Sequence, residues 1–270
     1  MKTLQRYTYM ALSYLKFNIQ RGLEYPAYLI SWLICNPMQF FFGILTIQVV
    51  ISNFQPLGGW EFEQLAFLYG LGVLSHGLSI VFFIQTWYMD YMVTQGEFDR
   101  MMLRPLNVFF QFCFMEFNFI GFTDLIPGLI LFTYGLISVG FAFSFINILK
   151  LLIVIIGATL LRGGIYTLTG SLSFWIQRTH KLVEINLGLF DYTMKYPLSI
   201  YPKIIQAVFT FILPFGFVCF YPASEFLNME TDFDFPGSFC VWVLVIGVFV
   251  YFLGIKLFNF GLKRYESSGS

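Results

Sequence analysis

Long apolar runs separated by short polar segments dominate the pattern along the chain. A bilayer hydrocarbon core of about 30 Å needs roughly 20 apolar residues in a helix. Six runs predict membrane-spanning helices: 27–51, 65–86, 114–137, 146–175, 204–220 and 239–260. The fifth run is the shortest, and Pro214 and Gly216 interrupt it. The pattern therefore predicts an all-α polytopic membrane protein with about six transmembrane helices, its single transmembrane domain covering 27–260.

The composition supports this class. Hydrophobic residues make up 58% of the 270 residues and charged residues only 11%. A soluble domain usually has about 25% charged residues, so this chain has too few to cover a water-facing surface. The formal net charge is zero, which leaves no basic field to favour nucleic acid as a partner. The expected environment is the lipid bilayer.

Basic residues predict the orientation, because cytoplasmic loops of membrane proteins carry an excess of Lys and Arg. Six spans place the following residues on the inner side: Lys2, Arg6, Lys16, Arg21, Arg100, Arg104, Arg178, Lys181, Lys195, Lys203, Lys256, Lys263 and Arg264. The predicted outer loops contain Lys150 and the acids Glu61, Glu63, Glu225, Glu230, Asp232 and Asp234. This asymmetry predicts that both termini, including the tail 261–270, are cytoplasmic.

The first 26 residues predict an amphipathic helix on the inner membrane surface. One face carries Lys2, Arg6, Ser13, Lys16 and Gln20, and the other carries Leu4, Tyr7, Ala11, Tyr14 and Leu15. The alternative is a cytosolic extension of the first span. Pro26 argues against that alternative, because proline interrupts a helix.

Two predicted cytoplasmic segments have the pattern of short surface helices. In the first, Gly96 breaks the preceding helix, and a new one then ends near Arg104 and Pro105. Its acids Glu97 and Asp99 lie in the first turn, as the helix dipole favours, and Arg100 follows them. The second segment, 177–196, repeats apolar residues at helical intervals. Either segment is suited to docking a cytosolic partner; ordinary interfacial loops are the alternative.

The outer segment 214–234 interrupts the apolar pattern before the last predicted span. Pro214 and Gly216 break the run, and Tyr221 and Pro222 follow within it. Such a break indicates either a kinked span or a re-entrant helical hairpin that turns back without crossing. The sequence leaves both open.

Three ionisable residues lie deep in the predicted spans, namely His76, Asp124 and Arg162. A charge at that depth is costly unless it is paired or wetted. Asp124 and Arg162 have opposite signs at similar depth, so we expect an interhelical pair. This polar group either holds the bundle together or lines a substrate path. His76 fits a neutral, hydrogen-bonded core residue.

The motif content gives no support for a catalytic role. The chain contains no GxxxxGK[ST] loop, so it lacks the P-loop means of binding ATP. Its two histidines lie far apart and its four cysteines form no CxxC pair, so we expect no metal site and no cofactor in this chain. No catalytic residue is assigned.

Several motifs resemble a known family. Residues 96–100 (GEFDR) and 103–107 (LRPLN) resemble the inner-loop signature of type-2 permeases of ATP-binding-cassette (ABC) exporters. Further similarities are 196–202 (YPLSIYP), 214–217 (PFGF) with 221–223 (YPA), and the ending 261–270 (GLKRYESSGS). The resemblance covers almost the whole chain. It is to a small bacterial branch in which two permeases often accompany one ATPase.

The resemblance implies a six-span permease in the bacterial inner membrane that dimerises and recruits two cytosolic ABC ATPase subunits, which hold ATP and magnesium. It implies that the N-terminal helix and residues 95–107 contact the ATPase, and that re-entrant helices precede the last span. It implies export of a drug-like, amphipathic, lipid or glycan substrate, with a second, different permease favoured over a homodimer. The alternatives are a membrane scaffold or sensor subunit and a membrane-embedded enzyme.

Overall fold

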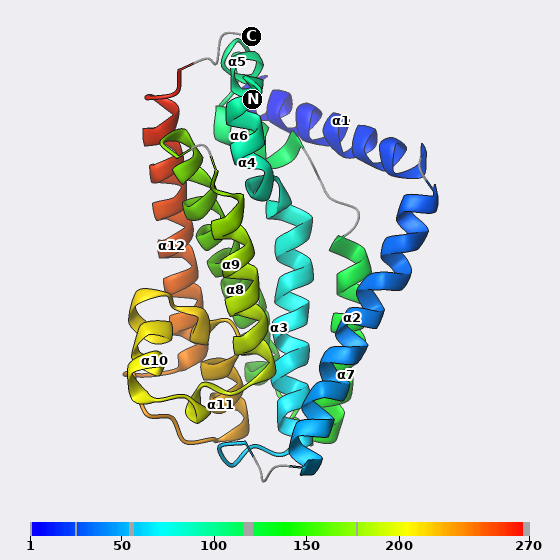
Figure 1. Cartoon of the computed structure of the whole chain (residues 1–270), viewed down its shortest axis with the longest axis vertical. Coiled ribbons are helices and arrows are strands. Elements are labelled where there is room, and N and C mark those ends of the chain that lie inside the picture. Colours follow the sequence, from blue (N-terminus) through cyan, green and yellow to red (C-terminus); the bar gives the residue numbers. More distant parts are fainter. Residues whose placement is uncertain (1, 25, 54–56, 116–120, 177, 267–270) are drawn as a thin grey trace.

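The computed structural model describes residues 2–24, 26–53, 57–115, 121–176 and 178–266. Its α-helices are α1 (Lys2–Glu24), α2 (Pro26–Asn53), α3 (Phe62–Phe83), α4 (Met89–Thr94), α5 (Glu97–Met102), α6 (Val108–Met115), α7 (Gly121–Ser138), α8 (Phe145–Ser171), α9 (His180–Lys195), α10 (Lys203–Ala207), α11 (Phe220–Leu227) and α12 (Phe239–Leu262). The long helices run side by side, and α1 lies across one end of the bundle (Figure 1). We call this the α5 end and the opposite one the α11 end.

Five helical segments of the described chain are long and apolar enough to cross a membrane: Ile30–Asn53, Phe62–Thr94, Gly121–Ser138, Phe145–Phe174 and Phe239–Leu262. They confirm the all-α polytopic class. They overlap five of the six predicted spans. Part of the predicted third span, residues 116–120, lies outside the described residues, as do Tyr25, Gln177 and residues 267–270.

The segment 177–196 differs from its prediction as a cytoplasmic surface helix. Helix α9 instead runs along the bundle beside α8, from the α5 end toward the α11 end (Figure 1). Its apolar side is buried, with Val183, Phe190 and Met194 almost inaccessible to solvent. The prediction failed because α9 has only 16 residues and carries charges along its exposed side, which is the pattern of a surface helix.

The predicted fifth span, 204–220, is not one continuous helix. After α10, a π-helical turn (Val208–Ile212) and a 3-10 turn (Phe215–Phe217) lead into α11. Figure 1 shows α10 and α11 together at the α11 end. A Cβ on Gly58, in the loop between α2 and α3, would lie 2.6 Å from Ser199 Oγ. Ser199, which follows α9, thus lies beside the loop between α2 and α3 at the α11 end. The chain has already reached this end before α10 begins, and it turns back there.

Along this path Lys195 and Lys203 lie toward the α11 end, so they do not share one side of the bundle with Arg178 and Lys181 as predicted. There, three lysines each pair with an acid. The Nζ–carboxylate distances are 2.7 Å for Lys195–Asp191, 3.3 Å for Lys203–Asp232 and 2.6 Å for Lys150–Glu225. Hydrogen bonds from Gln206 and then Lys203 hold the pKa of Asp232 below its ordinary value.

Glycines bring α8 and α12 into backbone contact. Gly157 and Gly164 on α8 are seven residues apart, and so are Gly247 and Gly254 on α12. A Cβ on Gly157 would lie 2.7 Å from the Leu244 backbone. A spacing of seven keeps small residues on one side of each helix along a near-parallel crossing. The two helices therefore pack as a single unit.

We expect Gly164→Ala to weaken this packing, because the added Cβ would lie 2.6 Å from the backbone nitrogen of Tyr251. Overpacking of this kind costs about 1–3 kcal/mol, which a thermal unfolding curve in mild detergent will show as a lower midpoint. Gly188→Ala in α9 is the matched control, since nothing lies within 4 Å of that Cβ. Equal midpoints for the two variants would contradict close packing at Gly164.

Candidate functional site

The α5 end contains the segment whose motif resembles the family's inner loop. Gly96 has φ +70°, a left-handed conformation that glycine adopts without steric cost, and it redirects the chain from α4 into α5. Phe98 and Met101 of α5 are buried. Their cluster includes Phe112 of α6 and Phe258 of α12. Helix α5 is therefore fixed on the elements beneath it.

The opposite side of α5 is polar and accessible. Arg100 donates a hydrogen bond to Glu97 across one helical turn, and its side chain is 71% exposed. Burial, together with the nearby Asp99 carboxylate, raises the pKa of Tyr265, just beyond α12, to about 12. Pro105 is exposed beyond the end of α5. This surface presents both charge signs on a rigid helix.

Helix α1 is bound to the α5 end by its own polar groups. Arg104 Nη1 donates to the Tyr14 hydroxyl at 2.6 Å, and the Asn107 amide donates to the Tyr7 hydroxyl at 3.1 Å. Asn18 Nδ2 donates to the Met115 carbonyl at 3.2 Å. Tyr7 and Tyr14 belong to the face predicted to lie on the membrane. These two hydroxyl groups instead contact the protein.

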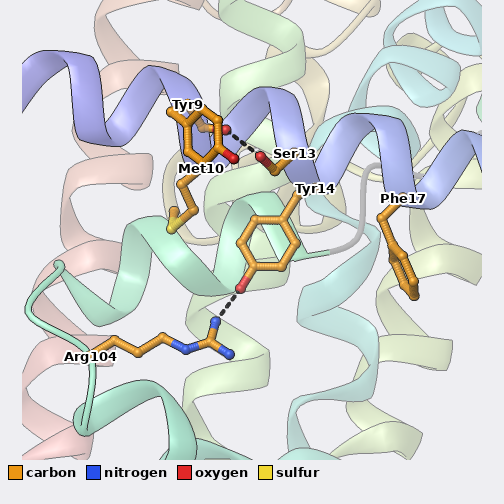
Figure 2. Close-up of a pocket in the computed structure, with 6 residues that line it drawn as sticks. All are labelled: Tyr9, Met10, Ser13, Tyr14, Phe17 and Arg104. Carbon is orange, nitrogen blue, oxygen red and sulfur yellow. Dashed lines mark hydrogen bonds between the residues drawn. The ribbon is translucent and has the colours of Figure 1, made fainter.

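A groove lies between α1 and the segment after α5 (Figure 2). Its volume is about 460 Å³, and its lining residues are Tyr9, Met10, Ser13, Tyr14, Phe17 and Arg104. Figure 2 shows Arg104 reaching toward Tyr14 from the wall opposite α1. The aromatic rings and the Met10 thioether thus line the same groove as the Arg104 guanidinium.

The three deep ionisable residues come together inside the bundle, with His76 between the other two. His76 Nδ1 lies 3.4 Å from Arg162 Nη1, and His76 Nε2 lies 3.9 Å from Asp124 Oδ2. The expected direct pair of Asp124 and Arg162 is therefore replaced by an arrangement through the imidazole. Asn36 Nδ2 donates to Asp124 and, at 2.9 Å, to Thr123 Oγ1.

Arg162 is fully buried and its remaining surroundings are mostly apolar. Its Cζ lies 4.3 Å from the centre of the Phe190 ring, a cation–π contact. Nη2 lies 2.8 Å from Met194 Sδ and 3.5 Å from the Gly72 carbonyl oxygen. Arg162 thereby joins α8 to α3 and α9.

The predicted break at 214–222 forms a packed turn at the α11 end. Pro214 precedes the 3-10 turn, and the Phe215 ring centre lies 4.2 Å from that of Phe190. The Tyr221 hydroxyl and Thr210 Oγ1 are 2.6 Å apart. A Cβ on Gly216 would meet the Leu198 side chain, and Pro222 is buried within α11.

Sequence reasoning did not assign a role to several of these residues. Asn36 has no assigned role in the sequence analysis, although an amide inside an apolar run already indicates a buried partner. Tyr7 and Tyr14, one heptad apart on α1, were assigned to the apolar face. Their hydroxyls were the missed signal, because a tyrosine at a contact usually hydrogen-bonds its hydroxyl group.

Among the described residues, no group of three His, Cys, Asp or Glu side chains is placed to hold a metal ion. The two candidate sites are the polar surface of α5 at one end of the bundle and the buried polar chain of Asn36, Asp124, His76 and Arg162 within it. Neither contains a nucleophile hydrogen-bonded to a base, the arrangement expected of covalent catalysis.

We expect His76→Leu to lower stability, because it removes the group that lies between Asp124 and Arg162 and leaves both short of partners. The cost of such unpaired buried groups is about 1–3 kcal/mol. The control is His180→Leu, the chain's other histidine, which is 52% exposed and pairs with Glu184 at 3.3 Å. Surface pairs contribute little, so thermal midpoints that fall equally would rule out a special role for His76.

One comparison with known proteins identifies a family for this chain. A search of curated proteins found no match. A family model described as ABC-2 family transporter protein matches residues 37–269, which include His76, Asp124 and Arg162, α5 and the turn at the α11 end. Members of this family are multi-pass membrane components of ABC transporters and associate with an ABC ATPase. The chain therefore belongs to the ABC-2 transporter family, as a permease subunit without a catalytic function of its own.

Proposed function

We propose that this permease is an exporter subunit and that separate ATPase subunits bind it at the α5 end. The observation that carries the proposal is the exposed polar side of α5, fixed through Phe98 to the cluster that includes Phe112 and Phe258. A contact made with Glu97 or Arg100 would act on α6 and α12 together. Arg104 would pass the same displacement to α1 through Tyr14.

The proposed orientation puts the α5 end in the cytoplasm of a bacterial cell, together with both termini. Arg100, Arg104, Arg178 and Lys181 all lie at this end, as the positive-inside rule favours. The lysines Lys150, Lys195 and Lys203 toward the other end are each paired with a carboxylate. Because each of these lysines is neutralised by its carboxylate partner, they argue little against this orientation.

The proposed transport complex contains two permeases and two ATPase subunits, with ATP and magnesium held by the latter. Helix α2 is the least buried of the five candidate membrane spans, and it diverges from α8 and α12 (Figure 1). Its exposed side chains include Trp32, Met38, Phe41, Phe42 and Val49. A second permease, favoured here as a different chain, would pack on this side, and an amphipathic substrate would cross between the two.

The orientation can be tested with single cysteines in a background without Cys35, Cys113, Cys219 and Cys240. Lys203→Cys, at a side chain 81% exposed, should react with a membrane-impermeant maleimide in intact cells. Leu103→Cys, at a position 86% exposed at the α5 end, should react only after the cells are opened. Protection of both cysteines in intact cells would show that α9 does not cross the membrane, whereas reaction of Leu103→Cys alone would reverse the orientation.

The coupling role can be tested with the charge reversal Arg100→Glu, which places two like charges one turn apart beside Glu97. Loss of one charged contact at an interface costs about 2–5 kcal/mol. We therefore expect at least tenfold weaker retention of the ATPase in a pull-down, with a matching loss of transport. Lys203→Glu is the control with the same charge change at the opposite end.

A pull-down with intact ATPase binding and intact transport in Arg100→Glu would reject the role of α5. ATPase binding that depends on Arg100, without any substrate-dependent change in ATPase rate, would instead favour a scaffold or sensor subunit.

A further inference from the structure

The groove between α1 and the segment after α5 extends beyond the Arg104–Tyr14 contact used above, and it has the features of a binding site. Its volume of about 460 Å³ lies within the range of small-molecule sites, roughly 300–1,000 Å³. Helix α1 lies across the end of the bundle (Figure 1). In the orientation proposed above, on which this inference rests, such a helix lies in the inner membrane interface.

The lining residues combine an apolar surface with a cationic group. Met10 and Phe17 project from the side of α1 that faces the groove (Figure 2). The hydrogen bond described for Arg104 uses Nη1 and the Tyr14 oxygen. A guanidinium has five N–H donors, so Arg104 retains donors for a second acceptor. The Tyr14 hydroxyl, which accepts from Arg104, still has its own hydrogen to donate.

The charges around the groove favour an anion. The described ionisable side chains of α1 before Glu24, apart from the tyrosines, are basic: Arg6 and Lys16. Arg6 precedes Met10 by four residues and is therefore its neighbour on the same helix face. Of the two acids of α5, Glu97 is paired with Arg100, and Asp99 interacts with Tyr265. Clusters of basic residues beside membrane helices attract anionic lipid headgroups.

We propose that this groove binds one anionic glycerophospholipid of the inner leaflet. The phosphate would accept hydrogen bonds from Arg104 and Tyr14, in the charge-assisted geometry that guanidinium and phosphate favour. The acyl chains would lie along Phe17, which is 59% exposed. The bound lipid would link α1 to the segment after α5 and make lipid composition a determinant of ATPase coupling.

The test is native mass spectrometry of the full-length chain in mild detergent, titrated with phosphatidylglycerol or phosphatidylcholine. We expect one tightly bound phosphatidylglycerol and no equivalent phosphatidylcholine. Arg104→Gln should weaken that binding roughly tenfold, the effect of one charge-assisted hydrogen bond. Lys181→Gln, a matched loss of positive charge at the same end of the bundle, concerns a side chain that is 78% exposed and outside the groove lining, and it should change the binding less than twofold.

A second pair of variants tests the space rather than the charge. Met10→Trp fills the groove and should abolish the bound lipid, whereas Leu12→Trp, at a position 60% exposed on a different face of α1, should not. If lipid binding falls equally in the two charge variants and equally in the two tryptophan variants, the bound lipid is annular only and the proposal is overturned. Displacement of the lipid by equimolar inorganic phosphate would also overturn it. The assay needs neither nucleotide nor ATPase, so its result is independent of the export proposal.

Discussion

The buried guanidinium of Arg162 is the constraint on which the arrangement of the bundle depends. A cation within an apolar membrane segment must find partners inside the protein, because the surrounding lipid offers none. The structure supplies the His76 ring, the Phe190 face and the Met194 sulfur. These groups come from α3 and α9, so Arg162 can be accommodated only when both helices pack against α8.

The same requirement extends to the α11 end. Phe190, which faces Arg162, also packs on Phe215 of the turn that follows α10. The turn therefore rests on the helix that accommodates the buried charge. On the other side, His76 leads to Asp124 and Asn36, which connects α7 and α2. One polar chain thus relates five helices that the hydrophobic effect alone would leave free to slide, since lipid tails are as apolar as their side chains.

Sequence alone predicted the elements whose signal is local. Apolar length located α2, α3, α8 and α12, and Gly96 with Pro105 located α5. It failed for α9, because a short helix with charges on one side has the same pattern whether that side faces water or the end of a packed bundle. Counting basic residues placed Lys195 and Lys203 on the same side as Arg178, because a count cannot register that α9 runs along the bundle between them. The partners of Tyr7 and Tyr14, about 100 residues away, lay beyond any local pattern.

The packing indicates where movement in a transport cycle would occur. Phe98 contacts Phe258 of α12, with ring centres 5.8 Å apart, and α12 meets α8 through glycines at backbone distance. Close packing transmits displacement, because it leaves no space to absorb it.

A push on α5 would therefore move α12 and α8 as one body, with α9 attached through Arg162. Helix α2 is joined to the remaining helices through Asn36, which donates to α7, and through its buried Phe40 and Ile47, whereas α1 is joined through hydroxyl and amide hydrogen bonds. The relative movement that opens a path is accordingly expected between α1–α2 and the remaining helices, which makes the polar contact at Asn36 its pivot.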